Sequence, residues 1–559
     1  SGSVIGNEQM EMGIEQSRFK GTFEVSDVTS IDFGLESSKV ENQGLTSSIQ
    51  QDTWGGVGDL GLLDDVLTRA SMSDQFDQIE GNDDPARTTD FFIADAADIK
   101  TIARQIYTDT GKVYQEVGDC GDGYCPSTVW EVDRYTEEES IAAYVQLNHS
   151  TELLIPEYGT YPLNIQLGIR HEETDITSMA LAPDISEVYT AGGNEVYYKF
   201  ETQVKAPYTG SYEKLLPSVD IDLTVRDDVV LRLSASQTIT RPSYTDIQGG
   251  ITASGTNFPN DNRPRAAGGN PGLEPILASN LDISFEWYYG EDSYFSLGYF
   301  VKDTEDFIGT SFRDEALFGD GGLADFKGTA IYAAVEADVI ASGNTDPSVT
   351  DITSQILSDY NIEGTVAFQN LSGSEVYVEN GEARLRGIAG QGDPLIWEIR
   401  SPANIDAAVI DGIEINLQHT FGDTGFGVIA NATLVNGNVQ FDNNNLEAQF
   451  ALNGLSDSAN LIAFYDKDKF EMRVAYNWRD NFLAGVGQDQ GRFTNPQNVR
   501  GFSQIDISAN YQYSENIRVF FAGINIGEST YRVYSRQEHQ VLQMGQTGAR
   551  YDFGITYNF

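Results

Sequence analysis

Segments in which apolar and polar residues alternate one by one recur along the whole chain. The last of them, residues 550–559, reads RYDFGITYNF. Its apolar, mostly aromatic positions are Tyr551, Phe553, Ile555, Tyr557 and Phe559, and the positions between them are polar or glycine. Successive side chains of a strand point to opposite faces, whereas a helix repeats every 3.6 residues. A period of two therefore predicts strands.

The same alternation occurs far from the C-terminus. Further examples are LDISFEWYY (281–289), LNIQLGIR (163–170), IAAYVQLN (141–148), VDIDLTVR (219–226), IEINLQHTF (413–421), FEMRVAYNWR (470–479) and QIDISANYQY (504–513). The polar sides of these segments carry ionised residues such as Asp222, Arg232 and Glu286. A soluble sandwich would bury one side in a core, whereas a membrane barrel turns its apolar side to lipid and its polar side to a wet interior. Strands of about 9–11 residues with ionised inner faces favour the barrel.

The expected fold is all-β: a transmembrane antiparallel β-barrel with roughly 14 to 16 strands in this chain. Candidate strands begin near residues 18, 29, 139, 161, 196, 213, 228, 279, 293, 408, 425, 457, 469, 502, 516 and 550. Tight links are expected at 289–292 and 465–469. Long links are expected at about 37–138, 241–278, 304–405, 480–501 and 527–549. Short turns on the periplasmic side and long loops outside the cell are typical of outer-membrane barrels.

Short helices are expected inside the first long loop. Residues 60–77 and 93–107 have helical spacing of their apolar residues. In the second segment Ile99, Ile102 and Ile106 share one face. We expect both segments to pack on the extracellular mouth of the barrel.

The charge of the chain narrows its partners. Its 559 residues include 34 Lys and Arg and 85 Asp and Glu, which gives a net charge of −51. Such an excess argues against nucleic acid as a partner, because nucleic-acid binding requires positive charge. Outer-membrane lipid and lipopolysaccharide are the expected surroundings. Lipopolysaccharide is itself anionic, so divalent cations or salt would have to screen the repulsion.

The two cysteines, Cys120 and Cys125, lie in the glycine-rich stretch DCGDGYC. A close pair of this kind predicts a small disulfide formed in an oxidising compartment. Two free thiols are the alternative.

Neither catalysis nor a resident cofactor is indicated. The sequence contains no HExxH, no GxSxG and no phosphate-loop signature, and we expect no enzyme activity and no metal. The acidic stretches 81–86, 118–125 and 312–322 could hold Ca²⁺, which prefers several oxygen ligands. A solvated acidic face is the simpler interpretation of these stretches.

A series of segments in order resembles the barrel of TonB-dependent receptors. They include TITRPSYTDI (238–247), GNPGLEPILASNLDISFEWYYGEDSYFSLGYFVKDTEDFI (269–308), IDGIEINLQHTF (410–421) and the closing strand. The resemblance implies a 22-stranded barrel in the bacterial outer membrane around an N-terminal plug. It also implies energised uptake of a scarce nutrient through TonB. The closing strand resembles the signal by which the outer-membrane machinery recognises barrels.

The chain also departs from the family pattern. Neither a plug domain nor the energy-coupling box is recognisable, and the strand count is about six short of 22. We therefore expect residues 1–559 to be the C-terminal, barrel part of the protein, with the plug in a missing N-terminal segment or a second chain. The alternative is a passive porin of about sixteen strands.

The resemblance and the charge of the chain bear on the class of nutrient ligand. Members of the family take up oligosaccharides, siderophores or cobalamin, and the acidic composition favours a neutral oligosaccharide over an anionic chelate. Sugar sites combine aromatic platforms with polar groups. The candidate ligand-binding residues are Trp54, Tyr124, Trp130, Arg241, Phe312 and Trp397. For each aromatic residue, packing within the loops is the alternative.

Overall fold

The computed structural model describes most of the chain. The described residues are 2–52, 60–79, 81–84, 90–110, 125–127, 130, 132–181, 184–191, 195–201, 205–253, 264–317, 325–359, 368–371, 374–379, 382–388, 393–446, 449–487 and 495–559. No helix in these ranges combines the length and the apolar character that crossing a membrane requires.

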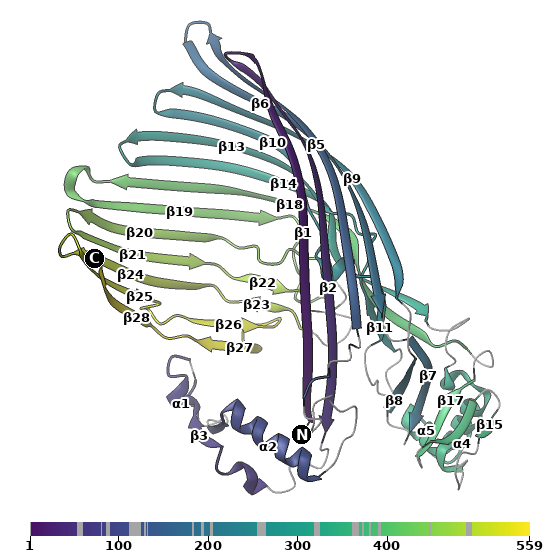
Figure 1. Ribbon diagram of the computed structural model, residues 1–559. Coiled ribbons are helices and arrows are strands. Elements are labelled where there is room, and N and C mark those ends of the chain that lie inside the picture. Colours follow the sequence, from purple (N-terminus) through teal and green to yellow (C-terminus); the bar gives the residue numbers. More distant parts are fainter. Residues whose placement is uncertain are drawn as a thin grey trace.

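One large curved sheet of 17 strands dominates the structure (Figure 1). Two of its strands are short, β11 (Ile251–Ala253) and β12 (Arg265–Gly268). Each of the others pairs antiparallel with the next long strand along the chain. These long strands are β1 (Gly2–Ser26), β2 (Thr29–Asp52), β5 (Val132–Ile155), β6 (Gly159–Leu181), β9 (Ala206–Arg226), β10 (Val229–Thr240), β13 (Ile276–Gly290), β14 (Ser293–Ala316), β18 (Ile396–Thr420), β19 (Phe426–Gly437), β20 (Ser458–Lys467), β21 (Phe470–Arg479), β24 (Phe502–Gln512), β25 (Ile517–Ile524) and β28 (Arg550–Tyr557). The predicted antiparallel barrel sheet and its strand number are confirmed. Within the described ranges β1 and β28 are the outermost strands, and no pairing joins them.

The strand register assembles a continuous apolar belt on one face. Ile31 of β2 lies opposite Leu147 of β5, which lies opposite Leu167 of β6. Leu167 in turn lies opposite Val219 of β9. Because side chains alternate between faces, the residues between them form a polar inner face. The apolar belt is the face that meets lipid.

The inner face contains cross-strand ion pairs. Arg232 Nη1 of β10 lies 2.7 Å from Asp222 Oδ1 of β9, and Arg232 Nε lies 2.9 Å from Glu286 Oε1 of β13. The ionised groups that the sequence placed on the inner side of the strands therefore pair with one another across it.

The first strands are longer than the sequence predicts. β1, β2, β5, β6 and β9 contain 21 to 25 residues, whereas a tilted strand crosses a bilayer in about 9–11. The loop expected at 37–138 is thus strand over 37–52 and 132–138, and the loop expected at 304–405 is strand at both ends. The extensions rise above the apolar belt, and those of β2 and β5 are mostly polar, as where Lys39 lies opposite Glu139 and Glu41 opposite Glu137. Little apolar period therefore remains to mark these two as strands, whereas Met10, Met12 and Ile14 of β1 still alternate with polar residues or glycine.

The turns lie at opposite ends of the sheet according to their length. The predicted tight links at 289–292 and 465–469 are confirmed as the β13–β14 and β20–β21 turns. Asp292 and Asp468 adopt left-handed backbone conformations there, with φ of 55° and 57°. Aspartate tolerates this conformation better than most residues. The long connections gather at the other end, together with the helices α1, α2, α4 and α5 (Figure 1).

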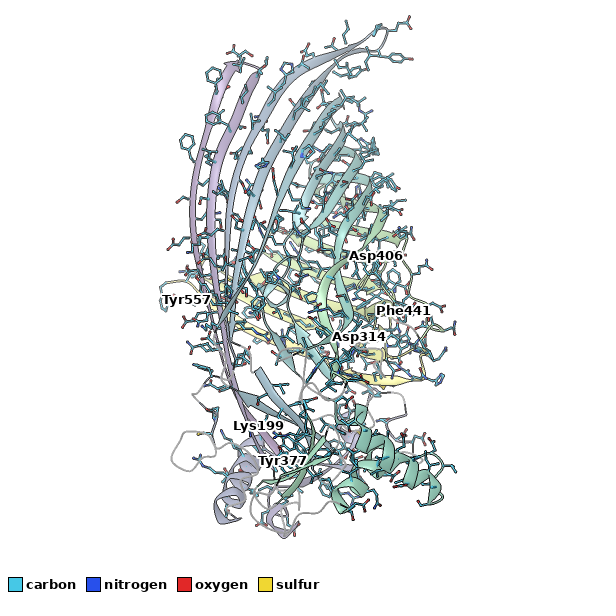
Figure 2. All side chains as sticks on the ribbon, turned by 90° about the vertical axis from the view of Figure 1, so that its right-hand side faces the viewer. Lys199, Asp314, Tyr377, Asp406, Phe441 and Tyr557 are labelled. Carbon is cyan, nitrogen blue, oxygen red and sulfur yellow. The ribbon has the colours of Figure 1, made fainter. Side chains whose placement is uncertain are left out.

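Two of these long connections build a small domain at the loop end, which we call the cap. Its five-stranded sheet contains β7 (Asp184–Ala191), β8 (Glu195–Glu201), β15 (Phe368–Leu371), β16 (Ser374–Glu379) and β17 (Glu382–Gly387). The helical elements are η2 (Phe326–Gly328), α4 (Ala330–Ala341) and α5 (Val349–Asp359). Ile352, Ile356, Val376 and Leu385 form its fully buried core. Figure 2 shows Lys199 and Tyr377 in the cap at the lower end of the view. Asp314 of β14 is labelled above them, and Asp406 of β18 is labelled above Asp314.

The cap corrects one predicted barrel strand. The candidate strand near residue 196 is β8, which pairs with β7 in the cap and not with the barrel sheet. Its alternation has another cause, because Val196 packs against the cap core and Tyr198 packs against a second buried cluster that contains Ile185 and Trp397.

The other elements at the loop end include the two segments that were predicted to be helices. The helix expected at 93–107 is confirmed as α2 (Ala96–Thr110). The helix expected over 60–77 is wrong as a continuous element, because η1 (Leu60–Leu63) and α1 (Met72–Gln75) are separated by strand β3 (Thr68–Ser71), which pairs with β4 (Asp90–Ile93). A four-stranded sheet contains β22 (Phe482–Gly485), β23 (Gln497–Val499), β26 (Thr530–Tyr534) and β27 (Val541–Gln546).

Candidate ligand site at the loop end

The connection between β10 and β13 comprises residues 241–275, and its described parts, 241–253 and 264–275, lie against the inner face of the sheet. We call this connection the inner loop. It contains the short helix α3 (Tyr244–Ile247), β11 and β12. Ile247 is fully buried against Ile176 of β6, Tyr212 of β9 and Leu273 of the loop itself. Ile176 and Tyr212 lie on the even-numbered, inward side of their strands, so the loop covers the face that lines the barrel.

Arg241 anchors the start of the inner loop. Its Nε lies 3.0 Å from Glu138 Oε1 of β5, and its Nη2 donates to Glu172 Oε1 of β6. Both carboxylates are buried, with 5% and 3% of their surface exposed. Burying two carboxylates without a cation would be strongly unfavourable. The arginine that the sequence proposed as a ligand contact is thus engaged in an internal ion-pair network.

The inner loop approaches the sheet so closely that glycine is required. The Gly249 amide donates to Ser178 Oγ of β6 at 2.7 Å. A Cβ at Gly210 of β9 would lie 1.9 Å from the Pro271 carbonyl oxygen, and a Cβ at Gly269 would lie 2.0 Å from the Gln248 carbonyl oxygen. Both neighbours are backbone atoms, which cannot move aside without shifting the loop.

A second set of contacts ties the end of the inner loop to β14 and β18. The Glu274 amide donates to Asn404 Oδ1 at 3.0 Å, and Asn404 Nδ2 donates back to the Glu274 carbonyl at 2.9 Å. Lys214 of β9 lies 3.1 Å from Glu274 and 3.5 Å from Asp306. In addition, β12 pairs in parallel with residues 398–400 of β18. The inner loop thus connects β5, β6 and β9 to β14 and β18.

A cavity of about 570 Å³ lies beside the inner loop. β5 contributes Arg134 to its wall, the loop contributes Asp246 and Thr252, and β14 and β18 contribute Thr310 and Arg400. Most of these side chains are polar. Its volume is within the range of sites that hold small molecules.

A second cavity of about 400 Å³ adjoins the first and is more aromatic. The two share Ile308, Gly309 and Thr310 of β14. Phe307, Phe312 and Phe450 line the second cavity. The rings of Phe307 and Phe450 meet edge to face at 5.0 Å. A third cavity of about 650 Å³ lies at the opposite end, between short turns.

Arg134 lines the first cavity and was not among the candidates that the sequence indicated. Its Nη2 donates to Thr252 Oγ1 at 2.8 Å, and its Nη1 contacts Gln248 Oε1 at 3.5 Å. Both partners are neutral. Because 37–138 was interpreted as a loop, Arg134 had no assigned face. Extending the parity of Ala142 and Ser140 backward along β5 would have placed it inward.

The structure places only some of the other ligand-binding candidates at a cavity. Phe312 lines the second cavity, and Trp130 is half-buried just before β5. Trp397 is fully buried against Tyr198, with ring centroids 5.3 Å apart, and offers no exposed ring face to a ligand. Trp54 and Tyr124 lie outside the described residues.

The cysteine and calcium predictions fall partly outside the described residues. Cys125 is disulfide-bonded, but Cys120 is not among the described residues, so the pairing of the two stays a prediction. Within the part of the chain that the structure describes, no three His, Cys, Asp or Glu side chains gather in a way that could hold a metal ion.

An antiparallel sheet with an apolar outer belt, short turns at one end and long loops at the other is the architecture of an outer-membrane β-barrel. The family described as "TonB dependent receptor-like, beta-barrel" matches residues 16–526, and the chain belongs to this family. Its members reside in the bacterial outer membrane and are receptors and transporters that bind a ligand and interact with TonB.

Solved structures of similar fold include three transport proteins, each with 10% sequence identity over 99% of this chain. They are the ferric citrate transporter FecA (TM-score 0.47), the copper transporter OprC (0.49) and the ferric yersiniabactin uptake receptor FyuA from Yersinia pestis (0.45). The chain spans 55%, 58% and 55% of their respective lengths. These likenesses carry no inference about the ligand of this chain. Among curated proteins, none matches it.

Proposed function

We propose that this barrel belongs to a receptor that captures a scarce nutrient at the cell surface and takes it up with energy delivered through TonB. The observation that carries the proposal is the inner loop, which is fixed across the inner face of the sheet beside two adjoining cavities. Membership of the TonB-dependent family supports it. Energy would reach the barrel through a plug domain, which we do not identify in residues 1–559.

The loop-end cavities suit capture better than free diffusion. A passive porin needs an open aqueous path, whereas a receptor needs a concave site that excludes much of the water around its ligand. The inner loop narrows the lumen on the side where β5, β6 and β9 face β14 and β18. A porin remains the second candidate, because loops that fold inward also narrow porin channels.

An oligosaccharide is the proposed nutrient class, with a siderophore or cobalamin as the alternative. Phe307, Phe312 and Phe450 could stack on the apolar faces of sugar rings, and the polar first cavity could bind their substituents. This division of apolar and polar surface is common in small-molecule sites.

Conductance measurements distinguish the receptor from the porin. Full-length native protein is inserted into planar bilayers, and single-channel currents are recorded. A receptor whose lumen is blocked should give no large steady conductance. Steady channels of porin size in the full-length protein would refute the proposal.

A further inference from the structure

The inward-facing arginines of the barrel differ in how their charge is compensated. Arg170 Nη2 lies 2.9 Å from Glu172, and Arg232 lies 2.7 Å from Asp222. Arg241 is held between Glu138 and Glu172. Arg134 makes no ion pair with any carboxylate among the described residues, and its bonds go to Thr252 and Gln248 only.

This contrast is unusual for a chain so rich in acid. With 85 Asp and Glu against 34 Lys and Arg, most buried guanidinium groups could acquire a carboxylate. The Nε of Arg134 is nevertheless buried without a hydrogen-bond partner. A charged group removed from water without compensation is costly, and a guanidinium has five donors in a planar fork that matches a carboxylate. An anion arriving from outside would supply the missing partner.

We propose that Arg134 is the anion receptor of the ligand site, and that the ligand carries a carboxylate beside a flat apolar ring face. The carboxylate would bind Arg134 in the first cavity. The ring would lie across Gly309 and pack on Phe312 in the second cavity. This inference rests on the proposed receptor function and names the chemical class of its ligand. It replaces the neutral ligand that the overall composition favours with an acidic one, because the local charge at Arg134 is positive.

The neighbours of Arg134 constrain how the anion enters. Asp246 also lines the first cavity, and its Oδ2 accepts a hydrogen bond from the Ser243 hydroxyl at 2.7 Å. Like-charge repulsion would keep a carboxylate on the Arg134 side of the cavity. Arg400 lines the same cavity, but the proposal does not depend on it.

Two kinds of nutrient present this chemistry: an acidic oligosaccharide built from uronic acids, and an aromatic carboxylate of the sort used in metal chelates. Matched pairs of probes separate them. The first pair is tetragalacturonate and its neutral methyl ester, and the second pair is salicylate and neutral salicylamide. Binding to purified full-length protein is measured by calorimetry, with folding checked by the heat-dependent gel migration of intact barrels.

In one of the two pairs, the acid should bind at least about tenfold more tightly than its neutral partner. Arg134→Met should weaken binding of that acid by about 10–100-fold, the value of hydrogen bonds to a charged group. Arg134→Lys keeps the charge without the fork and should retain part of the affinity. Arg226→Met, the same substitution at an exposed periplasmic turn, should leave binding unchanged.

The proposal would be overturned if the acid and its neutral partner bound with equal affinity in both pairs. It would also be overturned if folded Arg134→Met bound the acid as tightly as wild type does, or if neither acid bound wild type at millimolar concentration. Failure of the anion site and failure of the proposed transport function give different results. Energised accumulation of a neutral nutrient that does not depend on Arg134 would refute the anion site and leave the transporter intact. Acid binding through Arg134 without any energised uptake would support the anion site and refute the proposed transport function.

Discussion

At the scale of single residues, the arginines Arg134 and Arg241 have different kinds of partner. Both face inward near the inner loop, but Arg241 neutralises two buried glutamates whereas Arg134 has only neutral partners. The sequence singled out Arg241 because it follows a recognisable strand and precedes a long loop. The ion pairs of Arg241 could not be predicted, because they depend on the register of β5 and β6, which are far from Arg241 in sequence. The inward face of Arg134 could have been predicted from strand parity, but its neutral partners in the inner loop could not.

Arg241→Ala should destabilise the barrel by about 1–3 kcal/mol, because it leaves Glu138 and Glu172 buried without a cation. The loss should be concentrated in the inner loop, where amide hydrogen exchange of residues 241–250 should accelerate. Arg226→Ala is the matched control, since Arg226 pairs with Asp228 at an exposed turn and should contribute less than about 1 kcal/mol. Equal exchange in the two variants would contradict the anchoring role.

Cys120 and Cys125 should be joined to each other outside the cell. Intact-mass measurement of the unreduced protein should find it two hydrogens lighter than the reduced form. Without reductant, neither thiol should react with an alkylating agent. Alkylation of both cysteines in unreduced protein would remove the prediction.

At the scale of elements, strand alternation was readable where one face of a strand is apolar. The belt segments of β5, β6, β13 and β18 follow the predicted period, because one face must be apolar there. Above the belt both faces meet water, so the extensions of β2 and β5 leave little periodic signal. The alternation of β8 was real but reflects the cap core, which shows that a period of two identifies a strand without identifying its sheet.

The first turn of α5 should respond to pH through Asp351. Ser348 Oγ accepts from the Asp351 amide at 3.2 Å, and Asp351 Oδ2 accepts from the Ser348 amide at 2.9 Å, a reciprocal helix cap. The Ser348 amide and hydroxyl, with Asn344, lower the pKa of Asp351 below its usual 3.8. A lowered folded-state pKa means that the stabilisation is present above about pH 4 and is lost as pH falls through the folded value.

Amide exchange at the start of α5 should therefore accelerate, relative to other helices, as pH is lowered below about 4. Asp351→Asn should abolish this relative change, because an amide does not titrate. Asp346→Asn removes an exposed carboxylate nearby and should leave the change in place. An identical pH response in both variants would show that Asp351 is not its source.

The closing strand β28 should be required for assembly. Its last aromatic residue, Tyr557, meets Phe559 just beyond the strand edge to face at 4.9 Å, and Phe559 is fully exposed. Phe559→Ser should reduce the yield of heat-modifiable barrel in outer-membrane fractions several-fold. Tyr513→Ser, at another exposed aromatic residue in a short turn, is the control and should assemble normally. Wild-type yield from the Phe559 variant would contradict the assembly role.

At the scale of the whole molecule, sequence order proved more informative than composition. A net charge of −51, with no membrane-spanning helix among the residues that the structure describes, would suit many acidic proteins. The ordered series of alternating segments predicted the barrel sheet, and the family match agrees with it. The cap, the inner loop and the adjoining cavities could not be predicted, since they arise where connections of very different sequence position come together at one end of the sheet.

The central claim is that ligand captured at this end is taken up with energy supplied through TonB, and its most direct test is accumulation in cells. Cells that produce the full-length protein are given a radiolabelled ligand from the binding panel, with and without TonB and with and without a proton-motive force. Accumulation above the external concentration should occur only when both are present. Equal, non-concentrative entry in cells that lack TonB would contradict the account and identify the protein as a passive porin.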